Sequence, residues 1–528
     1  MKRKLITLLV IPCLLSGCSS TIPLSFEQFD SYIEETNMMV DYDDEHFYRV
    51  SETSKITHRD GEINSVNDLL ALNKTGKAKV AIPSVGNRKL LVVPVYFNDS
   101  NTSTLDEKLI YIQNAFFGKS ENTEYDSVVG YYNKSSYGQL RLSGEVAPWF
   151  NVGISSTQWK SLSSSHSTAS SIIAAKAVDY IKEHKLLDLD PYDTDHDGNI
   201  DGVYVVYDHP FDQKNTSDSL YWAFTYYTYE GENGLNKEAP FLNDFAWTSV
   251  NAITDVGGIA DNKSYTNYLI HETGHLLGLN DYYNVYYTGS NNFHYQPTGS
   301  FDMMDYNIGD HSAFSKYLLK WTSPMVLKHG TSFTYKLKPL QSSGEYILVP
   351  SSMFYDSPFG EYLLLEYFTP QDLNKYSEQF EYVTGNGGKI IYRYPQYYGL
   401  KIYHVNAALA YFKQGGGRSS ALARVDDPNA LEIIGNEKVA IDYRYDNSIT
   451  DQQMKNGEPV LYHLLESSGK NTFKDALPAT NDTLFTVGDD FGIKTFTDFT
   501  FSDGQSSGLK LKVKAISSQD ITLEISFE

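Results

Sequence analysis

Residues 268–281 read YLIHETGHLLGLND, and two histidines four positions apart stand within this mostly apolar run. Residues i and i+4 share one face of an α-helix, so His271 and His275 can both bind one Zn²⁺ ion. Glu272 would then project toward a zinc-activated water and act as the general base that takes its proton. The stretch therefore predicts a buried helix that carries a zinc site.

The chain after the second histidine supplies the rest of this predicted site. Gly278 can end the helix and turn the chain, so that Asp281 reaches the metal as a third ligand and one position stays open for water. Residues 299–306 read GSFDMMDY and resemble the Met-turn that underlies the metal in metzincin-like peptidases, with Met304 at the turn. Tyr306 would be placed to donate a hydrogen bond to an oxyanion, or it is a buried structural tyrosine.

The chain resembles the immune inhibitor A family of secreted zinc metallopeptidases, and the resemblance extends well beyond the zinc helix. It runs from about residue 88 to residue 528 and includes residues 128–138, 148–150, 193–202, 314–321 and 362–367. The resemblance implies a zinc endopeptidase whose substrates are proteins or peptides outside the cell.

One segment departs from the family pattern. After the second histidine the family usually reads Gly-x-Pro-Asp-x-Tyr-Asp, whereas this chain has Asn280 and Asn284 in place of the proline and the last aspartate. An acidic residue at the later position would be an alternative third ligand, and Asn284 would replace it poorly. Asp281 is therefore the expected third ligand.

Hydrophobic periodicity indicates the fold class. A buried strand is expected over residues 90–97, where Pro94 indicates a sheet edge or a bulge. A helix is expected after the capping-box sequence at residues 104–107, and another over residues 165–185. Beyond residue 324 the pattern changes to short alternating runs that are typical of strands. We therefore expect an α+β fold, with a zincin/metzincin-like catalytic domain (residues 86–324) followed by an all-β, sandwich-like C-terminal domain (residues 325–528).

Residues 193–202 read DTDHDGNIDG and have the spacing of a calcium loop. Position 12 of such a loop is Tyr204 rather than glutamate, so the bidentate ligand is missing. The loop is either completed from elsewhere and binds structural Ca²⁺, or is an Asx-turn loop without an ion. The expected calcium ligands are Asp193, Asp195, Asp197, Asn199 and Asp201.

The N-terminus has the layout of a secretory signal. Three basic residues precede an apolar run over residues 5–15, which is too short to cross a bilayer. Cys18 ends a sequence that resembles the lipobox of bacterial lipoproteins. Removal of residues 1–17 and lipidation of Cys18 would anchor the exported protein to the outer side of the cell membrane; the alternative is an ordinary cleaved signal. Cys13 leaves with the signal, so no disulfide within the chain is expected.

Residues 18–85 are polar and show no sustained hydrophobic pattern, which predicts a solvated tether. The alternative is an inhibitory pro-segment, in which an aspartate such as Asp43 would reach the zinc.

Composition excludes several other functions. The 528 residues carry a net charge of −23, which argues against nucleic-acid binding, and no glycine-rich phosphate loop indicates a nucleotide. No GxSxG sequence is accompanied by a plausible catalytic serine triad, which argues against a serine hydrolase. His294, His311 and His404 stand alone and are expected to be packed or exposed rather than metal-bound. The rival hypothesis is a catalytically inactive surface lipoprotein that binds glycans or host proteins through its aromatic-rich β-domain.

Overall fold

A computed structural model describes residues 45–50, 56–58, 61–73, 81–159, 162–163, 165–210, 223–254, 263–288, 295–375, 381–384, 390–393, 395–413, 421–424, 437–441, 447–475 and 477–528. All of them lie within the unit Met39–Glu528. Residues 1–17, Cys18, Asp43 and His294 lie outside the described residues.

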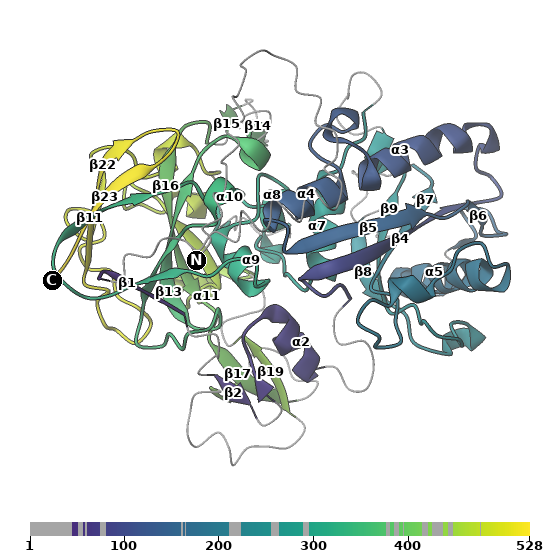
Figure 1. Ribbon diagram of the computed structural model, residues 1–528, viewed down its shortest axis with the longest axis horizontal. Helices are drawn as coiled ribbons and strands as arrows, with labels where there is room; N and C mark the ends of the chain where they lie inside the picture. The colour runs from purple at the N-terminus through teal and green to yellow at the C-terminus, as the bar shows by residue number, and fades with distance from the viewer. Residues whose placement is uncertain are drawn as a thin grey trace, which may run out of the picture. The chain divides into compact units, whose positions relative to one another are not determined.

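The first large sheet is built around a long apolar strand, β4 (Figure 1). Its strand order is β5-β4-β7-β9-β8, and the short strand β6 pairs with the end of β4. β5, β4, β7 and β9 run parallel, whereas the edge strand β8 is antiparallel to β9. The strands are β4 (Gly86–Tyr96), β5 (Leu140–Val146), β6 (Phe150–Asn151), β7 (Gly202–Asp208), β8 (Phe224–Tyr227) and β9 (Asp244–Ser249).

Helices cover both faces of this sheet because side chains on a strand alternate between its faces. Leu90 and Val92 of β4 pack in one core with α3 (Leu105–Phe117), α4 (Val128–Ser135) and α7 (Asn267–Leu276). Leu91 and Val93 pack in a second core with α5 (His166–Glu183). The predicted zinc helix is therefore α7, buried on one face of the sheet.

Two local predictions need correction. Thr104 precedes α3, but its side chain makes no cap hydrogen bond; the hydroxyl instead donates to the carbonyl of Asn101 at 3.0 Å, because a short 3-10 turn comes first. Pro94 lies in an inner strand, not at the sheet edge. It is tolerated because β5 ends at Val146 and β6 begins at Phe150, so the pairing partner of β4 is interrupted beside it.

The chain beyond residue 324 is rich in β-sheet. A six-stranded sheet has the order β1-β10-β12-β13-β16-β20, and a four-stranded sheet has the order β11-β23-β22-β21. Leu363 and Ile402 of the first sheet share one hydrophobic core with Leu511 and Leu523 of the second. The strands are β1 (Phe47–Arg49), β10 (Met325–Leu327), β11 (Phe333–Leu337), β12 (Ile347–Pro350), β13 (Glu361–Phe368), β16 (Gly399–Asn406), β20 (Tyr462–Leu465), β21 (Asp490–Phe491), β22 (Leu509–Ile516) and β23 (Ile521–Phe527).

Smaller elements complete the described fold. Three short sheets are β2 with β3, β14 with β15, and β18-β17-β19. Their strands are β2 (Thr57–His58), β3 (Gly61–Glu62), β14 (Glu381–Thr384), β15 (Ile390–Arg393), β17 (Leu409–Lys413), β18 (Ala421–Arg424) and β19 (Glu437–Ile441). The other α-helices are α2 (Val66–Asn73), α6 (Asn251–Thr254), α8 (Met303–Tyr306), α9 (Ala313–Leu318), α10 (Leu340–Ser343) and α11 (Asp451–Lys455). The fold is thus mixed α/β with a β-sheet-rich C-terminal region, and the expected domain boundaries stay predictions.

The described part of residues 18–85 is not a solvated tether. β1 pairs antiparallel with β10 and thereby joins the C-terminal sheet. Val66 and Leu70 of α2 pack against Gly278, at the turn after the zinc helix. The amide of Ile82 donates to the carbonyl of Leu276 at 3.0 Å. These residues are packed against the rest of the fold because they bury apolar side chains and pair backbone groups. The pro-segment hypothesis stays a prediction.

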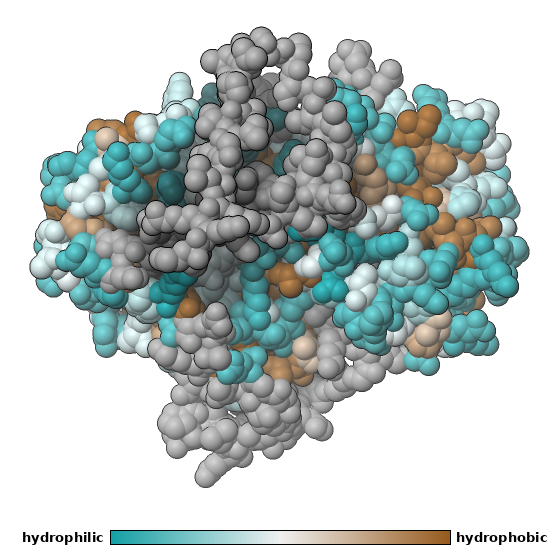
Figure 2. All heavy atoms as spheres, in the orientation of Figure 1, coloured by the Kyte–Doolittle hydropathy of each residue, from teal (hydrophilic) through white to brown (hydrophobic). Residues whose placement is uncertain are grey.

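None of the helices in the described ranges is long and apolar enough to cross a bilayer. On the face drawn in Figure 2, hydrophobic residues lie among hydrophilic ones.

Candidate metal centre

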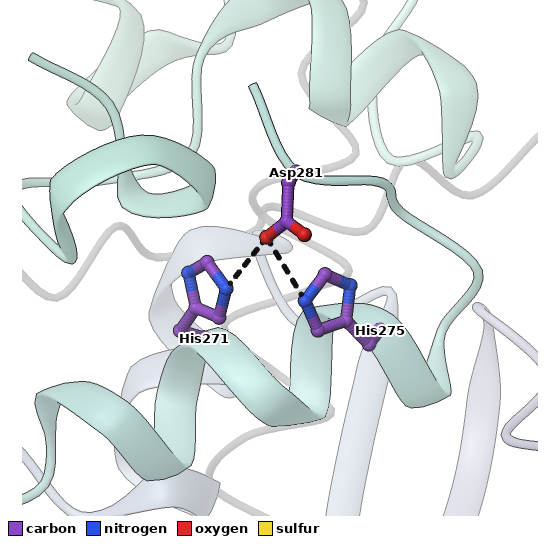
Figure 3. Close-up of side chains that lie close together, drawn as sticks. All are labelled: His271, His275 and Asp281. Atoms are coloured by element: carbon purple, nitrogen blue, oxygen red, sulfur yellow. Dashed lines mark hydrogen bonds and ion pairs between the residues drawn. The ribbon is translucent and has the colours of Figure 1, made fainter. Parts of the chain in front are cut away.

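Two imidazoles and one carboxylate converge above α7 (Figure 3). His271 and His275 rise from one face of the helix, as the four-residue spacing requires. Their Nε2 atoms lie 3.0 and 3.2 Å from one oxygen, Oδ1 of Asp281. One ligand atom from each residue lies within 4.8 Å of the other two, so the three groups can hold a metal ion.

Backbone carbonyls fix both rings. Nδ1 of His271 donates to the carbonyl of Met303 at 2.9 Å, and Nδ1 of His275 donates to the carbonyl of Leu279 at 2.8 Å. A carbonyl can only accept, so each Nδ1 carries a proton, and each Nε2 faces Asp281. This outer hydrogen bond is the arrangement that orients histidine ligands in metal sites.

The charges in this group are strongly coupled. Burial alone would raise the pKa of Asp281, but hydrogen bonds from His271 and His275 hold it well below its usual range. Burial alone would lower the pKa of His275, but the hydrogen bond and charge of Asp281 raise it to about 9. A bound metal ion would replace the protons on the two Nε2 atoms, and two neutral imidazoles with an ionised carboxylate are a donor set that suits Zn²⁺.

Glu272 lies beside these ligands in a buried position. Burial raises the pKa of its carboxyl group, although the neighbouring imidazoles act in the opposite direction. A carboxylate whose proton affinity is raised toward the working pH is better suited to general-base catalysis than an exposed one.

The short helix α8 lies under the site and contacts both parts of it. The carbonyl of Met303 accepts from His271, and the carbonyl of Met304 accepts from the amide of Tyr282 at 2.7 Å. The Met304 side chain lies directly against Gly274, where a Cβ atom would be 2.5 Å from Sδ. The third residue after His271 is glycine because the methionine occupies that space.

Asp302 caps α8, since its carboxylate accepts from the amide of Met304 at 2.8 Å. Burial raises the pKa of Asp302 to about 7. Burial likewise raises the pKa of Asp305 to about 7, and this side chain accepts from the hydroxyl of Thr298.

Several tyrosines surround the site. Tyr306 is 48% exposed and lies near Tyr265 and Tyr268, whose pKa values are raised mainly by burial. The oxyanion role of Tyr306 stays a prediction. Burial raises the pKa of Tyr283, as do the charge of Asp281 and a hydrogen bond to it. The sequence did not predict a role for Tyr283, and its position two residues after Asp281 is the only local signal for one.

Asn284 is not a ligand. Its side chain is fully buried and bonds to the backbone of Tyr295, Tyr286 and Ile449. The structure thus brings Asp281, and not residue 284, to the two histidines.

The predicted calcium loop is partly assembled. Carboxylate oxygens of Asp193, Asp195 and Asp197 lie within 4.8 Å of one another. Asn199 donates to Asp197 at 2.9 Å. Asp201 instead accepts from the backbone amide of Thr194 at 3.2 Å, and burial raises its pKa to about 7.

The remaining candidates are packed side chains. Nε2 of His311 lies 3.3 Å from the hydroxyl of Tyr132, and burial holds the pKa of His311 well below its usual range. Nε2 of His404 lies 2.8 Å from Glu361. Neither belongs to a group of metal-ligating side chains among the described residues.

Comparison with known proteins agrees with this geometry. Residues 93–307 match the family model described as the immune inhibitor A peptidase M6 catalytic domain. This segment runs from β4 to α8 and contains all three converging groups. No curated protein matches the chain. The chain carries the catalytic domain of a metalloendopeptidase, and this family implies zinc and protein substrates.

Proposed function

We propose that this chain, with its M6 metalloendopeptidase catalytic domain, is a membrane-anchored zinc endopeptidase in which His271, His275 and Asp281 hold the metal. The convergence of their ligand atoms beside a buried Glu272 is the observation that carries the proposal. In this proposal the mixed sheet with α7 is a zincin-like fold, and the two C-terminal sheets that share a core form the sandwich-like domain.

Zinc bound by these residues would polarise the scissile carbonyl and lower the pKa of water. Glu272 accepts the proton of the attacking water on its carboxylate and delivers it to the leaving amine. Met304 supports the histidine-bearing helix at Gly274. Tyr306 or Tyr283 would donate a hydrogen bond from its hydroxyl group to the developing oxyanion.

The edge strand β8 is suited to bind a peptide substrate in an extended conformation. Among the strands that the structure describes, β8 is the last on this sheet path, and it contacts α7, the helix that carries the ligands. An exposed strand edge binds an extended peptide through backbone hydrogen bonds. We therefore place the substrate backbone along β8, beside His271 and Glu272.

The proposal is tested on residues 19–528 with Glu272→Ala as the matched variant. We expect one zinc per chain in both proteins, because the substitution removes the base and leaves every ligand. Hydrolysis of labelled casein should fall about 10²–10⁴-fold in the variant. Full activity of Glu272→Ala would refute the proposed base, and absence of zinc from the wild type would refute the metal centre.

We further propose that lipidated Cys18 holds the enzyme on the outer face of the cell membrane. The lipobox-like sequence supports this location, and two or more acyl chains are needed for stable anchoring. Cys18→Ala should move the protein from the membrane fraction to the medium and abolish palmitate labelling. Equal membrane association of the variant would contradict the anchor.

A structural Ca²⁺ ion at Asp193, Asp195 and Asp197, with Asn199 and Asp201 nearby, is a separate proposal. The convergence of three carboxylates supports it, together with the calcium-loop spacing. Calcium should raise the thermal unfolding midpoint of the wild type and not that of Asp195→Asn. An equal response of both proteins would place any calcium effect elsewhere.

A further inference from the structure

The loop that carries Asp281 has no regular secondary structure of its own. α7 ends at Leu276, and residues 279–284 lie in neither a helix nor a strand. The Asp281 side chain is 25% exposed, so burial alone does not fix its position. Backbone groups in such a segment must find hydrogen-bond partners elsewhere.

Two buried asparagines, Asn284 and Asn447, supply these partners. Nδ2 of Asn447 donates to the carbonyl of Tyr282 at 2.8 Å, next to the metal-ligating carboxylate. The same group donates to the carbonyl of Tyr462 in β20 at 2.7 Å, while Oδ1 accepts from the amide of Tyr462 at 2.9 Å. Asn447 therefore ties the ligand loop directly to a strand of the C-terminal sheet.

Asn284 forms the second tie, three residues after Asp281. Its Nδ2 donates to the carbonyls of Ile449 at 2.9 Å and Tyr295 at 3.1 Å. Its Oδ1 accepts from the amide of Ile449 at 3.2 Å. Both ends of the amide are used, so an aspartate at this position would set a buried charge against two carbonyl oxygens.

We infer that Asn284 and Asn447 are positioning residues for the metal ligand Asp281, and that the C-terminal β-rich region therefore completes the metal centre. The inference rests on the proposed zinc peptidase function. Residues 447–449 and β20 lie outside the segment that matches the catalytic-domain model, residues 93–307. The matched segment alone consequently lacks Asn447 and the backbone of Ile449, which supply part of the hydrogen bonds that hold the loop of Asp281.

The test uses the isosteric substitutions Asn284→Asp and Asn447→Asp in residues 19–528. Each keeps the shape of the side chain and removes the amide donors. Asn236→Asp is the matched control, because Asn236 is also fully buried and exchanges two hydrogen bonds with the backbone of Leu242. Asn236 lies away from the metal centre, because its backbone amide donates to the carboxylate of Asp179 in α5 at 2.9 Å, on the sheet face opposite α7.

Zinc affinity is measured by competition with a chromogenic chelator, alongside the thermal unfolding midpoint and kcat and KM on a peptide. We expect zinc to bind about 10–100-fold more weakly to both site variants, with a lower kcat in excess zinc. Asn236→Asp should lose stability but keep wild-type zinc affinity. If an aspartate variant fails to fold, Asn447→Ala removes the same donor without burying a charge and is measured in its place.

Wild-type zinc affinity in Asn284→Asp and Asn447→Asp would overturn the inference, even if both variants were less stable. The same holds if Asn236→Asp weakens zinc binding as much as they do. A wild-type chain that binds no zinc would instead overturn the proposed function, and the inference with it.

Discussion

Nδ1 of His271 donates a hydrogen bond to the backbone carbonyl of Met303 over 2.9 Å. This bond joins the ligand-bearing helix to the short helix below it and fixes the tautomer of the imidazole. The neighbouring carbonyl, that of Met304, holds the loop of Asp281 through Tyr282. Two consecutive carbonyls thus orient two elements of the candidate metal centre.

Removal of zinc should lower the stability of the folded chain, because the ligands converge only in the native state. Relative to a solution in which free zinc is 100-fold above its Kd, the unfolding free energy of the zinc-free chain should be lower by about 2.7 kcal/mol. Urea unfolding with and without a chelator measures it. Glu272→Ala should respond like the wild type, whereas His275→Ala should show almost no response, and equal responses of all three would contradict the ligand set.

Gly274→Ala should destabilise the chain, because its Cβ atom would lie 2.5 Å from Sδ of Met304. Overpacking of this kind typically costs about 1–3 kcal/mol, and displacement of the Met304 side chain should also lower activity. The double variant Gly274→Ala, Met304→Ala should recover part of the loss caused by the clash. Additive effects in this double-mutant cycle, measured by urea unfolding, would show that the two side chains do not compete for space.

The stability of the chain should depend on pH through Asp302, whose pKa burial raises to about 7. Between an ordinary aspartate pKa of about 3.9 and about 7, the unfolded carboxyl is ionised while the folded one keeps its proton. The folded state therefore binds more protons, and unfolding free energy should fall as pH rises, by about 1.4 kcal/mol per pH unit from this group. Asp302→Asn should reduce the slope in urea unfolding by this amount across this range, while Asp201 and Asp305, whose pKa values burial also raises to about 7, keep their contributions; an unchanged slope would contradict the prediction.

A chain that starts at residue 86 should be less stable and less active than one that starts at residue 45. The shorter chain loses β1, which pairs with β10, and the packing of α2 against Gly278. Thermal unfolding and casein hydrolysis of the two chains measure the difference. An increase in activity of the shorter chain would instead support an inhibitory pro-segment within residues 45–85.

Local spacing was sufficient to predict the centre of the site. His271 and His275 share a face because the period of an α-helix brings positions i and i+4 together, and Gly278 allows the turn that returns Asp281 to them. Local patterns also predicted α3, α5 and the apolar part of β4.

Only the tertiary structure decided what holds that centre in place. Asn284 bonds to Ile449 across 165 positions of the chain, and β1 joins a strand that begins at Met325. Thr104 fails as a side-chain cap because the preceding turn engages its hydroxyl, and Pro94 is tolerated inside a sheet because its neighbouring strand is interrupted. Such contacts depend on which distant segments the folded chain brings together, and no periodicity or spacing within a short stretch of sequence encodes that choice.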